Sequence, residues 1–272
     1  MAMTKPKLRS TAVRARGAAE PPAKNGTLSQ TVTRALDILR SFDNKSRELG
    51  VTEISQKLNL PKAIIFRLVQ TLREYEFLEQ NPENSKYRIG IGAFEIGNLF
   101  KSSTLEAESA PFMRQLVDET GHTAQLAVLH RNETVIIARM EGRGPLKYGV
   151  SVGERRPVHS SAVGKAILSM LNTQQLDEVL VAAHFKKMTP NTITDRKALI
   201  ADVVRTRERG YSINWEENTI GVASLAAPVP SRQSNTLAAL ALAFPANPTV
   251  KKDIPRIGKL LSIAARSLAA RV

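Results

Sequence analysis

The sequence predicts an α+β protein with two folded domains, and three observations support this prediction. Its 272 residues are enough for two domains, each with a core of its own. Apolar residues recur at helical spacing in the first third of the chain, whereas strand-length apolar runs alternate with helical patterns in the rest. The content of 42% hydrophobic and 24% charged residues is typical of a folded protein and not of a disordered chain.

Composition excludes several kinds of chemistry. The chain has no cysteine, which rules out disulfides, thiolate metal sites, iron–sulfur clusters and cysteine nucleophiles, and which fits a reducing compartment. The longest uninterrupted apolar run, from Leu237 to Phe244, is far shorter than the roughly 20 residues of a membrane helix. No secretory leader pattern opens the chain. We therefore expect a cytoplasmic protein with no membrane partner.

The basic charge balance points to a polyanionic partner. The formal net charge is +14, and residues 1–28 contain six basic residues and one acidic residue without hydrophobic periodicity. This segment predicts a flexible basic arm, and a solvated tail without a specific partner is the alternative. A positive charge alone does not make a protein recognise a DNA sequence, because recognition requires a structural element that presents side chains to a DNA groove.

Residues 29–90 predict a winged helix-turn-helix domain. Apolar residues recur every three to four positions before a short hairpin pattern, and Thr52 and Pro61 are typical of helix starts. In such a domain the second helix of the pair lies across the first and enters a major groove about 12 Å wide. The predicted elements are helices at residues 31–42 and 52–58, a tight turn at 59–61, a helix from Pro61 to about Tyr75, and hairpin strands at 77–78 and 86–89.

The third of these helices carries the candidate DNA contacts. Basic side chains on its outer face can reach phosphates or guanine, and a glutamine there can address adenine. The alternative is an ordinary three-helix core with a solvated basic face. The predicted DNA-binding residues are Lys62, Ala63, Phe66, Arg67 and Gln70 on this helix, together with Arg34, Lys86 and Arg88.

A linker helix and a second domain follow. Residues 91–104 predict a helix with too many apolar residues for a solvated spacer, which suggests packing against another subunit or the second domain. Residues 105–272 predict one antiparallel sheet with helical cover, because their strands pair by hairpins with helices outside them. The predicted strands are 124–130, 134–140, 146–152, 211–214, 222–229 and 237–244, and the predicted helices are 105–119, 161–171, 174–183, 195–209 and 254–269.

Motifs in both halves resemble one known family. The first half contains Val32-Thr33-Arg34-Ala35-Leu36-Asp37-Ile38-Leu39, Leu60-Pro61-Lys62 and Gln70-Thr71-Leu72. The second contains Arg155-Arg156-Pro157-Val158-His159, Ala162-Val163-Gly164-Lys165-Ala166 and Thr189-Pro190-Asn191-Thr192-Ile193-Thr194-Asp195. In this order and spacing, residues 28–270 resemble IclR-type transcriptional regulators. The helix-turn-helix match is weak by itself, but the two halves together are specific.

The resemblance implies a one-component switch. It implies a double-stranded DNA operator as partner, a GAF/profilin-like C-terminal domain that binds a small effector, and a homodimer or homotetramer that assembles through the winged domains and linker helices. Such regulators repress or activate genes for the catabolism of aromatic acids, sugar acids or glyoxylate-type compounds. Effector binding changes DNA affinity because the ligand binds two arrangements of the protein differently.

The resemblance also implies which residues line the effector pocket. With Tyr148 and Arg156 nearby, we expect a carboxylate ligand with an apolar or aromatic body, held partly by backbone N–H groups at a helix start. Plain core packing is the alternative for each apolar position. This chain departs from the family pattern at Asn214, Ser224, Ala241 and Ala243, and it has Ala63-Ile64 where the family commonly has Ser-Thr. The implied effector-binding residues are Tyr148, Arg156, Ala162, Val163, Gly164, Asn214, Val222, Ser224, Ala241 and Ala243.

Enzyme motifs are absent from the sequence. The Gly164-Lys165 pair lacks the earlier Gly and the following Ser or Thr of a phosphate loop, and the four histidines lack metal-ligand spacing. Glu216 and Glu217 are adjacent, so on a strand they would point to opposite faces. We therefore expect no catalytic residues, no metal and no cofactor. An enzyme-like small-molecule-binding protein and a non-sensing architectural DNA-binding protein are the alternatives.

Overall fold

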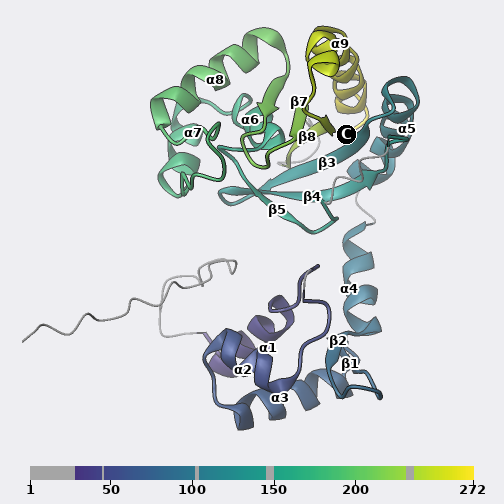
Figure 1. Ribbon diagram of the computed structural model, residues 1–272, viewed down its shortest axis with the longest axis vertical. Helices are drawn as coiled ribbons and strands as arrows, with labels where there is room; N and C mark the ends of the chain where they lie inside the picture. The colour runs from purple at the N-terminus through teal and green to yellow at the C-terminus, as the bar shows by residue number, and fades with distance from the viewer. Residues whose placement is uncertain (1–27, 45, 102–103, 145–149, 231–235) are drawn as a thin grey trace, which may run out of the picture. The chain divides into compact units, whose positions relative to one another are not determined.

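The computed structural model describes residues 28–272 apart from residue 45 and residues 102–103, 145–149 and 231–235 (Figure 1). The chain divides into two compact units, the first ending at Phe100 and the second starting at Lys101. Within the described residues no helix is both long and apolar enough to cross a membrane.

The first unit is a winged helix-turn-helix, as predicted. Its elements are α1 (Gln30–Arg40), α2 (Val51–Leu58), α3 (Lys62–Glu74), β1 (Leu78–Gln80), β2 (Tyr87–Ile89) and α4 (Ile91–Lys101). The antiparallel hairpin β1–β2 forms the wing, and Leu49 adds a bridge to Tyr87 on its second strand. Ile38, Ile54 and Ile65 from the three helices are fully buried in one core, which holds α3 against the other two helices.

Two local details differ from the predictions at the helix starts. Helix α2 begins one residue earlier than Thr52, because the Glu53 carboxylate accepts a 2.6 Å hydrogen bond from the Gly50 N–H and closes the first turn. Pro61 lies just before α3 and not in its first turn. Asn59 has a left-handed φ of 53°, which ends α2 and lets the chain turn sharply into α3.

The second unit contains one six-stranded antiparallel sheet, which confirms the predicted fold class. The strand order is β5-β4-β3-β8-β7-β6, and every pair in it is antiparallel. The strands are β3 (Thr123–His130), β4 (Glu133–Met140), β5 (Arg155–Pro157), β6 (Ser212–Trp215), β7 (Val222–Pro230) and β8 (Leu237–Pro245), and the helices are α5 (Thr104–Thr120), α6 (Ala162–Leu168), α7 (Thr173–Val181), α8 (Arg196–Arg209) and α9 (Pro248–Ala269).

Helices cover both faces of this sheet. Helices α5 and α9 pack against one face, where Leu126, Leu240 and Leu261 belong to the larger core (Figure 1). Helix α6 packs against the other face, with Val163 in a smaller core. Helices α7 and α8 pack on the outer side of α6. The alternation of side chains along each strand therefore decides which residues face α6.

The strand predicted at residues 146–152 is wrong where the structure describes it. Residues 151–154 form a turn, closed by a 3.1 Å hydrogen bond from the Glu154 N–H to the Ser151 carbonyl, and φ of Gly153 is 86°. The strand is β5, at Arg155–Pro157. Branched apolar residues occur in both kinds of segment, so composition did not separate them. Helix α6 ends at Leu168 instead of 171, and α9 begins at Pro248 instead of 254 because Asn247 caps its first turn.

Candidate nucleic-acid interface and effector site

The start of α3 presents an exposed cationic face. Lys62, Ala63, Phe66 and Arg67 are all exposed, with 54% of Phe66 accessible. Neither Lys62 nor Arg67 forms an ion pair with any other described residue. Arg34 on α1 is half-buried. The opposite face of α3 packs into the core, so the two basic side chains remain available to an external anion.

Gln70 lies deeper than predicted. Its Nε2 donates a 3.0 Å hydrogen bond to the Tyr87 hydroxyl, and both side chains are at least half-buried. This bond links α3 to the wing. Base reading by Gln70 would require breaking the bond, so the structure places the residue as a support of the wing and not as a free reader.

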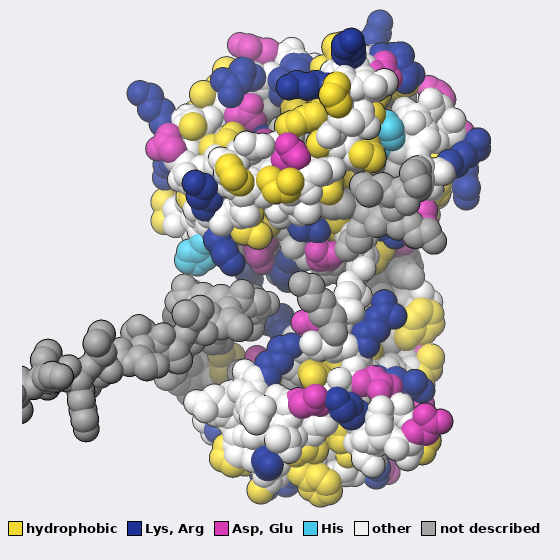
Figure 2. Space-filling model, viewed as in Figure 1, with side chains coloured by type: hydrophobic (Ala, Val, Ile, Leu, Met, Phe, Trp, Pro, Cys, Tyr) yellow, Lys and Arg dark blue, Asp and Glu magenta, His cyan; other side chains and the backbone are white. Residues whose placement is uncertain are grey.

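The two predicted basic residues of the wing are paired with carboxylates. Lys86 Nζ lies 2.9 Å from Glu53 Oε1, and Arg88 Nη2 lies 2.7 Å from Glu79 Oε1. The hydrogen bond and charge of Arg88 lower the pKa of Glu79, which keeps this carboxylate ionised. Figure 2 likewise shows basic side chains mixed with acidic ones on the visible face of each unit. Unpaired positive charge is thus a feature of the α3 face rather than of the wing.

The register of the second sheet brings several predicted effector residues onto the α6 face. Ser224 pairs with Ala243 on one side and with Asn214 on the other. Two residues farther along β7, Ala226 pairs with Ala241 on β8. Both Ala241 and Ala226 belong to the core beneath α6. Val222 lies at the start of β7 on the same face, and its register partner on β8 is Pro245.

The start of α6 is more tightly packed than the resemblance implies. Ala162, Val163 and Gly164 are all buried. A Cβ on Gly164 would lie 2.4 Å from the Val158 backbone, so glycine is needed here for close packing. The Gly164 N–H donates to the Ser161 hydroxyl at 3.2 Å. This N–H is therefore already used by a helix cap and is not free to hold a carboxylate.

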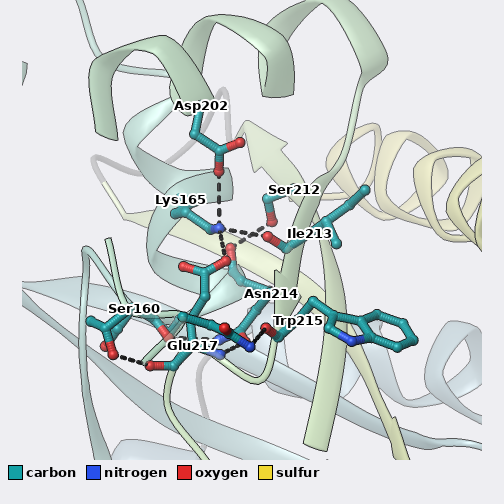
Figure 3. Close-up of polar contacts among 12 residues, drawn as sticks. Ser160, Lys165, Asp202, Ser212, Ile213, Asn214, Trp215 and Glu217 are labelled. Atoms are coloured by element: carbon teal, nitrogen blue, oxygen red, sulfur yellow. Dashed lines mark hydrogen bonds and ion pairs between the residues drawn. The ribbon is translucent and has the colours of Figure 1, made fainter. Parts of the chain in front are cut away.

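Asn214 also uses its carboxamide within the fold (Figure 3). Its Nδ2 donates to the Ser160 carbonyl at 2.6 Å, and its Oδ1 accepts from the Glu217 N–H at 3.0 Å. The neighbouring Ser212 hydroxyl donates to the Ala162 carbonyl at 2.7 Å. These bonds tie the end of β6 to the segment that enters α6. Asn214 thus holds together the backbone segments around the implied effector site, whereas the resemblance implies that it contacts the effector directly.

Behind α6 lies a buried ionic cluster that the sequence analysis did not predict (Figure 3). Lys165 is 1% exposed, and its Nζ lies 2.5 Å from Glu217 Oε1, 2.9 Å from Asp202 Oδ2 and 2.5 Å from the Ile213 carbonyl. The only sequence signal was a single lysine within the otherwise uncharged segment of α6. The cluster joins α6, α8 and the loop after β6.

The two carboxylates of this cluster have opposite pKa shifts. Burial raises the pKa of Glu217, and the charge of Lys165 offsets only part of that effect. Burial opposes ionisation of Asp202 too, but the charge and hydrogen bond of Lys165 and the contact with Arg205 lower its pKa overall. Glu216, with φ of 59°, lies beyond the end of β6, so the strand alternation expected for Glu216 and Glu217 does not apply.

The predicted effector residue Arg156 lies at an edge of the sheet. Arg156 on β5 has Nη2 2.8 Å from Glu154 Oε1 and Nη1 3.4 Å from Asn218 Oδ1. Since β5 and β6 are opposite edges of the sheet, the contact with Asn218 joins β5 to the loop after β6. The positive charge of Arg156 is therefore shared with Glu154. Tyr148 lies outside the described residues.

Gln125 on β3 is a polar residue that the sequence analysis missed. Its register partners are Ala241 on β8 and Arg139 on β4, which place it on the α6 face. It is 6% exposed, and its Nε2 has no hydrogen-bond partner among the described residues. Thr123, two residues earlier, accepts a bond from the Gly142 N–H at 3.1 Å. The alternation of polar and apolar residues along β3 was the signal for this position.

Comparisons with known proteins agree with the two-unit architecture. Residues 31–82 match the family described as the IclR helix-turn-helix domain, and residues 98–270 match the family described as bacterial transcriptional regulator IclR C-terminal. The regulator XynR of Escherichia coli K12 is 36% identical over 214 residues, which cover 78% of this chain and 85% of XynR.

Solved structures share the fold along most of the chain. An IclR transcriptional regulator from Alicyclobacillus acidocaldarius has a TM-score of 0.79 at 26% identity, and the match covers 89% of this chain and 98% of that one. An IclR homologue from Microbacterium hydrocarbonoxydans, complexed with 4-hydroxybenzoate, has a TM-score of 0.75 at 22% identity, with 89% and 100% covered. With both domain matches in sequence order, the chain belongs to the IclR family of transcriptional regulators.

Proposed function

We propose that this regulator binds a DNA operator through the start of α3 and that a small carboxylate, bound between α6 and the sheet, changes its operator affinity. The controlled genes are then those of a catabolic pathway for that acid, and the protein acts in the cytoplasm. The observation that carries the DNA-binding part is the exposure of Lys62 and Arg67 on α3, neither of which forms an ion pair with another described residue. Recognition helices present their N-terminal residues to base edges, which fits this placement.

DNA binding is tested on the region upstream of the gene. Footprinting locates the operator, and fluorescence anisotropy of a labelled duplex then measures affinity. Arg67→Ala and Lys62→Ala are each expected to weaken binding by about 1–3 kcal/mol if the residue reads a base. Arg73→Ala is the matched control, because Arg73 lies at the far end of α3 and donates to Gln80 Oε1 at 3.1 Å. Equal affinities for all four proteins would contradict the assignment of α3.

The carboxylate ligand is supported by the residues on the α6 face. Alanines at 226, 241 and 243 line the sheet there, and each has a smaller side chain than the branched residues usual in strands. A fold relative complexed with 4-hydroxybenzoate supports an aromatic acid as one candidate. A thermal-shift panel of aromatic acids, sugar acids and neutral sugars tests the proposal. Stabilisation by neutral sugars alone would contradict it.

Sensing is tested by the same anisotropy assay with ligand added. An acid that stabilises the protein is expected to change operator affinity by about 5- to 150-fold, the usual range of allosteric coupling. An architectural protein would bind the operator with the same affinity at every ligand concentration. That result would leave the DNA-binding proposal intact and remove the sensing proposal.

We further propose a homodimer or homotetramer that assembles in part through α4. Ile91, Phe94, Ile96 and Leu99 on this helix are 57–75% exposed, which is unusual for so many large apolar side chains on one helix. Sedimentation measurements on the wild type and on Ile96→Glu test this assignment. The variant is expected to dissociate at concentrations at which the wild type is associated. Identical masses for both proteins would assign the assembly to another surface.

A further inference from the structure

Gln125 is a buried residue whose amide nitrogen has no hydrogen-bond partner among the described residues. It is 6% exposed, and no described residue provides a partner for its Nε2. A buried amide without hydrogen bonds loses its water contacts and gains nothing in return, so folded proteins contain few of them. Those that persist usually serve a bound molecule or an ordered water.

The other polar side chains nearby on this face are mostly engaged. Asn214, Ser212 and Thr123 all make hydrogen bonds within the fold. Besides Gln125, Ser224 on β7 makes no side-chain hydrogen bond to a described residue, and it is half-buried. The Gln125 amide and the Ser224 hydroxyl therefore lie on β3 and β7, which are separated by the single strand β8.

Between these two groups the sheet carries only small side chains. Ala241 lies beside Gln125, and Ala243 lies beside Ser224. Neighbouring strands are about 4.8 Å apart, so β3 and β7 are separated by about 10 Å. A molecule lying over the alanines would thus meet a hydrogen-bonding group at each end and apolar surface in the middle.

We propose that Gln125 is a specificity-determining residue of the effector site, with its Nε2 donating to the ligand carboxylate while Ser224 bonds a hydroxyl at the other end. This inference rests on the proposed function of the second unit as a carboxylate sensor. It names the ligand class more narrowly, as a compact hydroxy acid whose two polar groups are joined by an apolar body. Arg139, the register partner of Gln125 on β4, adds positive charge on the same side, although Glu141 pairs with it at 3.0 Å.

Two near-isosteric variants test the role of the carboxamide without any ligand. Gln125→Met removes an unsatisfied amide and is expected to raise the melting temperature of the ligand-free protein. Asn214→Leu is the matched comparison, because it removes a buried carboxamide that makes two hydrogen bonds, and it is expected to lower the melting temperature. A lower melting temperature for Gln125→Met would show that the amide is satisfied within the free protein, for example by water, and would overturn the proposal.

Ligand selectivity provides the second measurement. The probes are 4-hydroxybenzoate and 3-hydroxypropionate, each compared with its primary amide by thermal shift and calorimetry. The wild type is expected to prefer an acid over its amide, and Gln125→Glu is expected to reverse the preference, with the affinity for the acid falling by about 10- to 100-fold. Unchanged selectivity in Gln125→Glu would overturn the role of Gln125 while the carboxylate sensor stands. If the wild type bound neither of the two acids, this inference would be overturned. The proposal of a carboxylate sensor would be overturned as well only if no acid of the wider panel stabilised the protein.

Discussion

Replacing Lys165 by methionine would test whether the buried ionic cluster holds the second unit together. Methionine keeps most of the length and apolar volume of the lysine side chain but removes the ammonium group. The carboxylates of Asp202 and Glu217, at 2.9 and 2.5 Å from Lys165 Nζ, then lose their shared cation. Arg205 still contacts Asp202 at 3.1 Å, whereas Glu217 Oε2 is buried and has no described partner even in the wild type.

The expected loss is large on the scale of domain stability. Removing one partner of a buried ion pair costs about 3–5 kcal/mol, because the remaining charge is desolvated and unpaired. With a denaturant dependence of about 2 kcal/mol per molar urea, a loss of about 4 kcal/mol lowers the urea midpoint by about 2 M. Protonation of Glu217, whose pKa burial already raises, limits the loss to this range.

Urea denaturation followed by tryptophan fluorescence measures this effect on the second unit alone. Trp215 is the single tryptophan of the chain and lies at the end of β6, two residues before Glu217. The control is Arg196→Met, which breaks an ion pair of 2.5 Å with Asp177 on the surface of the same unit. Exposed pairs contribute about 0–1 kcal/mol. If Lys165→Met cost no more than Arg196→Met, the buried cluster would not stabilise the unit and the reasoning would be refuted.

Three further predictions follow from the geometry. Gly164→Ala is expected to destabilise the second unit by about 1–3 kcal/mol, because its Cβ would lie 2.4 Å from the Val158 backbone; an unchanged urea midpoint would contradict this packing. Burial raises the pKa of Glu217 above its unfolded value of 4.5. The contribution of Glu217 to folding stability is therefore complete below pH 4.5 and is lost as the pH rises through its pKa in the folded protein. Glu217→Gln lacks this loss, so its stability relative to the wild type should improve as the pH rises above the unfolded value. A trend in the other direction in urea titrations would count against the assignment. Operator affinity should fall steeply with salt concentration. Arg67→Ala should reduce the slope of log affinity against log salt concentration by about 1 if Arg67 neutralises a phosphate. Equal slopes for the variant and the wild type would place Arg67 away from the DNA backbone.

The order of elements was predictable because its signals are local. Helical periodicity, Pro61 and the polar turn between two short apolar segments define the winged helix-turn-helix without reference to distant residues. The antiparallel sheet followed in the same way from short strands joined by turns. The exceptions had local causes. Val150 and Val152 are branched apolar residues, but residues 151–154 form a turn, and the Asn247 cap of α9 was not recognised.

The detailed chemistry of the candidate site was less predictable because it depends on register and on contacts between distant segments. The resemblance to a family placed Asn214 and Gly164 near an effector, but it could not reveal that bonds to Ser160 and Ser161 already occupy their polar groups. The pairing of Lys165 with Glu217 joins positions 52 residues apart. Likewise, only the folded arrangement shows that Gln125 Nε2 has no hydrogen-bond partner among the described residues.

The alanines beneath α6 also limit how this regulator can diverge. Alanine is the smallest side chain with a Cβ, so substitutions at positions 226, 241 and 243 can add side-chain volume on this face of the sheet but scarcely remove it. If the proposed effector site lies on this face, single changes on β7 and β8 in a duplicated gene would therefore favour smaller or differently shaped effectors. A bulkier effector would instead require α6, whose buried residues pack on these alanines, to lie farther from the sheet.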